Sequence, residues 1–162
     1  MSVDMFIKFE GPAIAGESQD SVHKGEIDVL AWSWGLSNSG NAQLGTGSGA
    51  GKVSVGNLNF TKFVDSATTS LFLATCNGQH YATVTLVVRK AGTTPVEYVK
   101  IVMNQVLVTS LSTGGSGGED RLTENVSLNF AKVQVNYIPQ KADGSVEATK
   151  TITWNIAGNV QA

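Results

Sequence analysis

The glycine-rich stretch at residues 114–118, GGSGG, formally fits the nucleophile motif G-x-S-x-G. In hydrolases this serine lies on a strained turn between a strand and a helix. Here the apolar alternation that is typical of a strand resumes at Leu122, so a strand follows Ser116. The hydrolase order also places the histidine after the serine, whereas His23 and His80 both precede Ser116, although other triad orders exist. We interpret the stretch as a β turn and retain a serine hydrolase using Ser116 as an alternative.

A second glycine-rich stretch, GSGAGK at residues 47–52, resembles a phosphate-binding loop only in part. The first glycine of that motif would be Thr46, and Val53 stands where a serine or threonine would hold magnesium. A loop between two strands also lacks the helix N-terminus that faces a phosphate. The sequence therefore argues against nucleotide binding.

The histidines and the single cysteine do not have the paired spacing of a metal site, so we expect no metal and no cofactor. Cys76 lies in an apolar run without basic neighbours, and we expect it to be a buried, unreactive thiol. His23 is expected in a solvated loop.

Two tryptophans, Trp32 and Trp34, share one face of a predicted strand, and the small residues Ala31 and Ser33 share the other. Such indoles can stack on a sugar, which makes a carbohydrate-binding module a second alternative. More often they anchor a core or a subunit contact, because burying each is worth about a few kcal/mol. The opposite face would be smooth and weakly polar, as the wall of a wide channel is.

The positions of these residues depend on a fold that the composition predicts to be mainly β. Val, Ile and Thr total 41 residues, against 18 for Glu, Lys and Arg. Apolar residues alternate over residues 3–9 and 152–156, and those over 97–111 keep one phase. The alternation changes phase near Lys132 and again between Val55 and Leu58. Each change implies a β-bulge or a strand that passes between sheets, as in barrels and orthogonal sandwiches.

One short helix interrupts the strands. Asp65, Ser66 or Thr68 can cap it, and Asn77-Gly78 ends it. No linker or repeat divides the chain, so we predict a single domain over residues 1–162.

Charge and hydropathy exclude two classes of partner. Eleven basic and thirteen acidic residues give a net charge of -2 without a basic cluster, which argues against nucleic acid. No apolar run reaches the roughly 20 residues that span a bilayer, and the N-terminus lacks a signal-peptide pattern, so we expect synthesis in the cytoplasm. Ser, Thr, Asn and Gln total 48 residues against 24 charged ones. A surface so poor in charge favours self-association.

Several segments resemble the haemolysin-coregulated protein (Hcp) family of bacterial type VI secretion. These are VDMFIKFEG at the start, GEIDVLAWSWG at 25–35, the block at 58–81 and the block at 112–144. The resemblance implies two curved sheets that form a β-barrel with one short α-helix. It also implies a homo-hexameric ring, stacking of rings into a hollow tube, and no enzyme activity. In the family the tube works with sheath and spike proteins, carries small effectors in its lumen, and is secreted without a cleaved signal peptide.

The resemblance also assigns residues. Ser33 in AWSWG would face the lumen and contact effectors. The loop over residues 38–51 would reach a neighbouring ring. The residues assigned to this contact are Ser39, Asn41, Gln43, Leu44 and Gly47. Glu119, Asp120 and Arg121 of the GGEDRLTEN block would lie at the joint between adjacent subunits.

Overall fold

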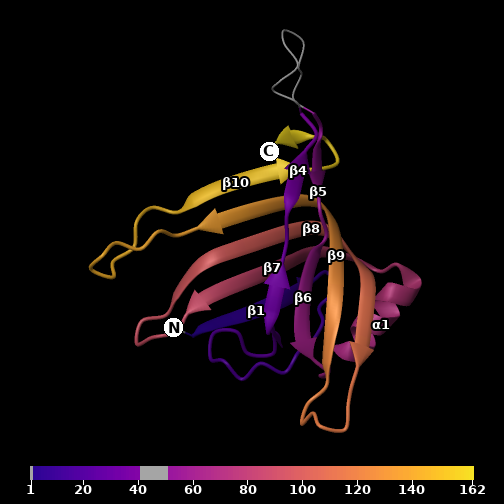
Figure 1. Cartoon of the computed structure of the whole chain (residues 1–162). Helices are drawn as coiled ribbons and strands as arrows, with labels where there is room; N and C mark the ends of the chain where they lie inside the picture. The colour runs from indigo at the N-terminus through magenta and orange to yellow at the C-terminus, as the bar shows by residue number, and fades with distance from the viewer. Residues whose placement is uncertain (1, 41–50) are drawn as a thin grey trace.

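The computed structural model describes residues 2–40 and 51–162, which form eleven strands and one helix (Figure 1). The elements run β1 (Val3–Glu10), β2 (Ile27–Asp28), β3 (Ala31–Ser33), β4 (Leu36–Asn38), β5 (Val53–Val55), β6 (Leu58–Phe63), α1 (Thr68–Asn77), β7 (His80–Lys90), β8 (Val96–Gly114), β9 (Thr123–Tyr137), β10 (Lys150–Asn155) and β11 (Val160–Gln161). Within the described residues no helix has the length and apolar character needed to cross a membrane.

Nine of the strands form one strongly curved sheet. Its main path is β11-β10-β9-β8-β7-β1-β2, and β6 and β3 branch from β9. The segment from β2 to β3 joins the two edges, because β2 pairs with β1 and β3 pairs with β6. At the crossing, the amide of Val29 donates to the Met5 carbonyl (2.9 Å) and the next amide, of Leu30, donates to Thr61 (2.8 Å). The expected mainly β, barrel-like fold with one short helix is confirmed.

Strand β9 changes partners along its length, as its change of phase predicts. Its first half pairs with β6 and its second half, from Lys132 to Tyr137, pairs with β10. Buried side chains shift from even positions, ending at Phe130, to odd ones, beginning at Val133. The Ala131 carbonyl between them accepts the amide of Ile156 (2.9 Å). The predicted corner near Lys132 is confirmed.

Strand β8 differs from the prediction of one phase over residues 97–111. Ile101 and Met103 are buried at odd positions, but Val106 and Val108 are buried at even ones. Between them Gln105 has φ 54°, a left-handed conformation that turns the strand over. The single phase is therefore wrong beyond Met103, because one residue of unusual backbone conformation is invisible in an apolar pattern.

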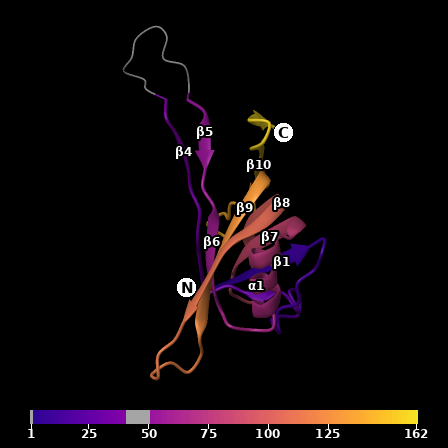
Figure 2. The same cartoon turned by 90° about the vertical axis from the view of Figure 1, so that its right-hand side faces the viewer.

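At the second predicted change of phase, between Val55 and Leu58, the chain passes from one sheet to another. β4 and β5 form a separate two-stranded ladder that projects from the barrel, and the chain joins the large sheet at Leu58 (Figure 2). The amide of Gly56 donates to the Gly35 carbonyl (2.9 Å) at the base of this hairpin.

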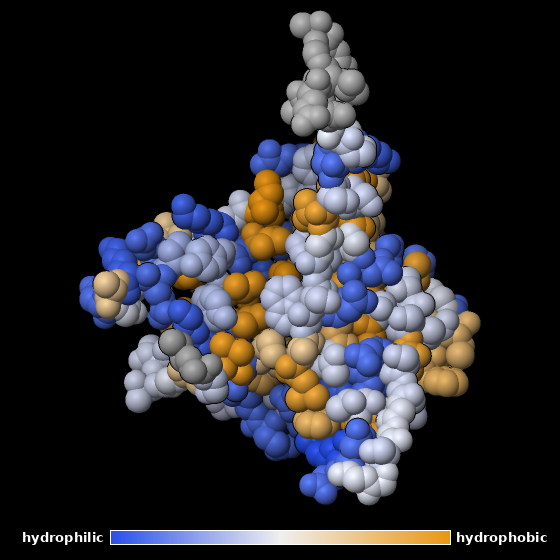
Figure 3. Space-filling view, in the orientation of Figure 1, coloured by the Kyte–Doolittle hydropathy of each residue, from blue (hydrophilic) through white to orange (hydrophobic). Residues whose placement is uncertain are grey.

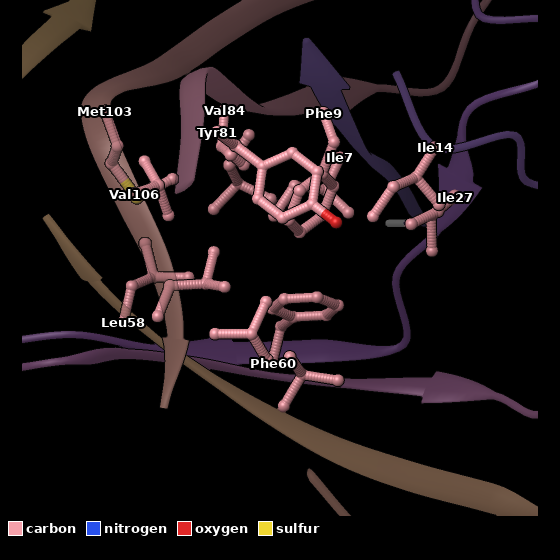
Figure 4. Close-up of a cluster of buried hydrophobic side chains, with 14 of the residues drawn as sticks. Ile7, Phe9, Ile14, Ile27, Leu58, Phe60, Tyr81, Val84, Met103 and Val106 are labelled. Carbon is pink, nitrogen blue, oxygen red and sulfur yellow. The ribbon is translucent and has the colours of Figure 1, made fainter. Parts of the chain in front are cut away.

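Large apolar side chains from opposite walls fill the barrel (Figure 4). Phe9 meets Tyr81 edge to face at 5.1 Å between ring centroids, and Phe60 lies on the other side of the core. The opposite face of β1 is covered too, because Phe6 is also buried.

Helix α1 ends at the predicted Gly78 and begins near the predicted residues, although its N-cap residue is Ala67, which makes no side-chain capping hydrogen bond. Asp65 Oδ1 accepts the amide of Ala67 (2.9 Å) at the start, and Gly78, with φ 69°, donates its amide to Ala74 at the end. Leu71 and Ala74 face the barrel. Cys76 lies on the other side of this short helix and is exposed, so the expected buried thiol is wrong.

His23 also differs from the prediction. It lies in the connection between β1 and β2, but this connection packs back on the barrel and leaves His23 only 7% exposed. Carboxylates of Glu26 and Glu97 contact its two ring nitrogens.

Candidate functional site

Ser33 ends β3 on the outward face of the barrel, and the strand register shows what surrounds it. Residues that pair across an antiparallel ladder share a face. Two rows therefore cross β3, β6, β9 and β8 side by side. One row is Ser33, Asn59, Ser127 and Ser110, and the other is Ala31, Thr61, Asn125 and Ser112. We call these eight residues the neutral rows, because they contain small or uncharged polar side chains only.

The neutral rows are tied together by their own side chains. Thr61 Oγ1 donates to Asn125 Oδ1 (2.6 Å), and the Ser127 hydroxyl donates to Asn59 Oδ1. A shallow cavity of about 210 Å³ lies beside Ser33, against Trp32 and Asn59. This arrangement forms an uncharged wall in which four of the polar side chains pair with one another.

A different surface lies behind the projecting hairpin, between it and β10. It is an apolar groove of about 410 Å³, visible as apolar side chains below the hairpin in Figure 3. The lining residues are Trp34, Leu36, Val53, Val55, Val133, Val135, Ile152 and Trp154. The indole nitrogen of Trp34 donates to the Gly56 carbonyl (3.0 Å), and its ring lies 6.1 Å from that of Phe130. Trp32 and Trp34 pack against the core, which does not favour a sugar-stacking platform.

The predicted loop to a neighbouring ring is described only at its base. Ser39 follows β4 and is exposed. Asn41, Gln43, Leu44 and Gly47 lie outside the described residues.

The predicted subunit-joint residues lie in the turn between β8 and β9. Glu119, Asp120 and Arg121 are exposed, and the Arg121 guanidinium lies 3.8 Å from the centroid of the Phe63 ring. Ser116 accepts the amide of Glu119 through its carbonyl (3.2 Å) in the same turn. Because two strands flank Ser116, the strand-to-helix elbow of a hydrolase is not formed here.

Close to this turn lies a buried ionic cluster that sequence reasoning missed. Lys62 and Glu124 are both fully buried and their side chains pair directly. The Lys62 ammonium also contacts Asp65 Oδ1 (2.8 Å), and Thr68 Oγ1 donates to Glu124 Oε1 (2.8 Å). The cluster connects β6, β9 and the start of α1. A signal was present, because Lys62 and Glu124 occupy the inward phase of their strands.

Comparisons with known proteins agree with this architecture. The sequence profile described as "Type VI secretion system effector, Hcp" matches residues 6–137. The chain is 57% identical to "Protein hcp1" of Pseudomonas aeruginosa over 164 aligned residues, which cover all of both chains.

Solved structures show the same fold. Hcp1 from Salmonella typhimurium is 36% identical to this chain and has a TM-score of 0.82. The superposition covers 100% of both chains. A type VI secretion system effector from Yersinia pestis is 33% identical with a TM-score of 0.76, over 94% of this chain and 99% of that one.

The curved barrel with its projecting hairpin is thus the fold of a type VI secretion protein. This chain belongs to the Hcp family.

Proposed function

We propose that residues 1–162 act as one domain, the structural subunit of a type VI secretion inner tube. Six copies close into a ring, rings stack into a hollow tube, and the lumen carries small effector proteins. The chain works by assembly rather than catalysis, is made in the cytoplasm, and leaves the cell through the type VI system with its sheath and spike proteins. Membership of the Hcp family supports each of these statements.

The observation that carries the proposal is a pair of uncovered apolar surfaces on one chain. One is the apolar groove, and the other is the outer side of α1, where Phe72 is 62% exposed and Leu73 is 60% exposed. In Figure 1 the helix lies at the right edge, away from the hairpin and β10 that border the groove. A closed ring needs two different surfaces that fit each other, since each copy contacts its neighbours head to tail. Burying one large apolar side chain contributes about 1.5–3 kcal/mol.

We assign the neutral rows, with Ser33, to the lumen. A wall without charge holds neither acidic nor basic cargo strongly, which suits a passage that must both retain and release proteins. Glu119, Asp120 and Arg121 are assigned to the joint between neighbouring subunits, and Ser39 with the following loop to contacts between rings.

Gel filtration coupled to light scattering tests the assembly. We expect particles of about six times 17.0 kDa, seen as rings by negative-stain microscopy. Particles of 17.0 kDa over a wide range of dilution and salt would overturn the proposal.

Leu73→Asp tests the apolar contact itself. A charge at this exposed position leaves the fold intact but cannot be buried against a neighbour, so we expect 17.0 kDa particles. Ser70→Asp, also exposed on α1, is the matched control and keeps the ring. A ring that survives Leu73→Asp would show that α1 lies outside the joint, while the tube function would stand.

A further inference from the structure

His23 is held by two carboxylates at once. Its Nδ1 lies 2.7 Å from Glu26 Oε2, and its Nε2 lies 2.6 Å from Glu97 Oε1. Only 9% of the His23 side chain is exposed. Glu26 belongs to the same connection as His23, whereas Glu97 belongs to β8, so the imidazole joins the connection over residues 11–26 to the barrel.

The protonation state follows from these distances. A neutral imidazole has one N–H group, and an ionised carboxylate only accepts hydrogen bonds. Two hydrogen bonds from ring nitrogens to carboxylates therefore require both nitrogens to donate. The site holds one proton more than a neutral histidine and two carboxylates would, and the imidazolium satisfies both contacts.

Further groups keep the ring in place. Phe6 stacks on the imidazole with 4.4 Å between centroids and 14° between planes. The Arg89 guanidinium lies 5.1 Å from the centroid of the same Phe6 ring and pairs with Asp20 (2.6 Å) and Asp4 (3.1 Å). Asp20 Oδ2 also accepts the backbone amide of His23 (3.1 Å).

Other charged groups lie farther from the His23 ring. Asp28 of β2 and Lys100 of β8 lie in register with Phe6 across the sheet. The pKa of Lys8 on β1 is raised by Glu10 and, to a lesser extent, by Glu26. Lys24 follows His23 in the chain and is exposed. The two carboxylates in direct contact with the ring outweigh these more distant charges at short range.

We propose that His23 is a proton-operated latch that fastens residues 11–26 to the start of β8. While the ring carries both protons, the two ends of the latch are joined. When the pH rises, one proton leaves to solvent, one of the two hydrogen bonds is lost, and one carboxylate faces the ring without a donor. The connection then loosens from the barrel edge.

Loosening of residues 11–26 also affects α1, because this connection contacts the residues just before the helix. Glu17 Oε2 accepts the backbone amide of Ser66 (2.6 Å), next to the N-terminal end of α1. Loosening residues 11–26 therefore removes support from the element that carries Phe72 and Leu73.

The geometry gives the sign of the effect. The latch holds while both ring nitrogens donate to Glu26 and Glu97, and it is lost when one of these two hydrogen bonds is lost. Paired carboxylates act in the opposite direction, since they lose their contribution as the pH falls.

Hydrogen exchange with mass spectrometry between pH 5.5 and 8.5, corrected for intrinsic exchange rates, tests the latch in the intact protein. We expect the protection of amides in residues 14–26 to fall by about tenfold or more as the pH rises, since a hydrogen bond to a charged group is lost. His23→Gln should show low amide protection at every pH. In Glu97→Gln the protection should likewise no longer depend on pH, although His23 itself is retained. His80→Gln, at the exposed start of β7, is the matched control and should behave as the wild type.

Nitrogen-15 NMR of the histidine rings gives an independent measurement. The His23 ring should show two protonated nitrogens at mildly acidic pH and lose one in step with the loss of protection. A neutral His23 ring throughout this range, or the same protection profile in wild type and His23→Gln, would overturn the latch. Neither result would affect the mass of the assembly, so the proposed function is tested separately.

Discussion

The two sides of strands β6 and β9 carry opposite chemistry, and the usual arrangement of charge is inverted between them. The outward side holds the neutral rows, among them Asn59, Thr61 and Asn125. The inward side holds the fully buried pair Lys62 and Glu124. Charged side chains normally stay in water, since burying an ion costs several kcal/mol even when it is paired. These strands therefore bury charge where burial is costly and carry none on the exposed side, which fits the proposed assignment of the outward side to the lumen.

Breaking the buried pair should produce the largest effect. Glu124→Ala leaves the Lys62 ammonium buried with fewer partners, so we expect a loss of about 3–5 kcal/mol in the free energy of unfolding. Guanidinium unfolding at fixed protein concentration measures this loss. Asn125→Ala, the next residue on the outward side, is the control and should cost less than about 1 kcal/mol.

The double change Lys62→Met with Glu124→Leu sharpens the result. Replacing both charges with apolar groups of similar size removes the unpaired ammonium and should recover part of the stability that Glu124→Ala loses, while Asp65 loses its ion partner. Equal losses in the double and single variants would show that the ions themselves, rather than an unpaired charge, determine stability.

Adding charge to the outward side should leave stability nearly unchanged but alter function. Ser33→Glu puts a carboxylate on an exposed position, so we expect a change within about 0.5 kcal/mol and an intact ring. Small proteins that co-purify with the wild-type ring should be lost, as gel filtration and mass spectrometry would show. Ser33→Thr is the conservative control and should retain them. Undiminished co-purification with Ser33→Glu would remove Ser33 from the lumen.

The smallest effect is expected for the ion pair between Arg89 and Asp20, which is neither fully buried nor fully exposed. The hydrogen bond from Arg89 holds the pKa of Asp20 well below its ordinary value. Stability from this pair is therefore present above about pH 4 and is lost as the pH falls further, towards the lowered pKa. Thermal unfolding between pH 2 and 6 should show this acid loss weakened in Asp20→Asn. An unchanged acid limb would mean that the pair contributes nothing to folding.

Much of the candidate site could be foreseen because its signals are local. The face of Ser33 follows from the two-residue period of a strand, and the corner near Lys132 follows from the change of that period. The helix limits follow from Asp65 and Gly78. The resemblance to the Hcp family assigned the lumen to Ser33, but the neighbours of Ser33 depend on strand register, which no periodicity reports.

The local sequence of this chain determined that it would form strands, where two of them would turn, and where a short helix would end, because each of these depends on neighbours within a few positions. The tertiary structure alone decided that Lys62 would meet Glu124, 62 residues away, and that His23 would meet Glu97, 74 residues away. It also turned β8 over at Gln105 and left Cys76 on the outer side of α1. Burial and charge pairing depend on which surfaces come together when the barrel closes, and that contact energy is carried by pairs of residues rather than by any one stretch of sequence.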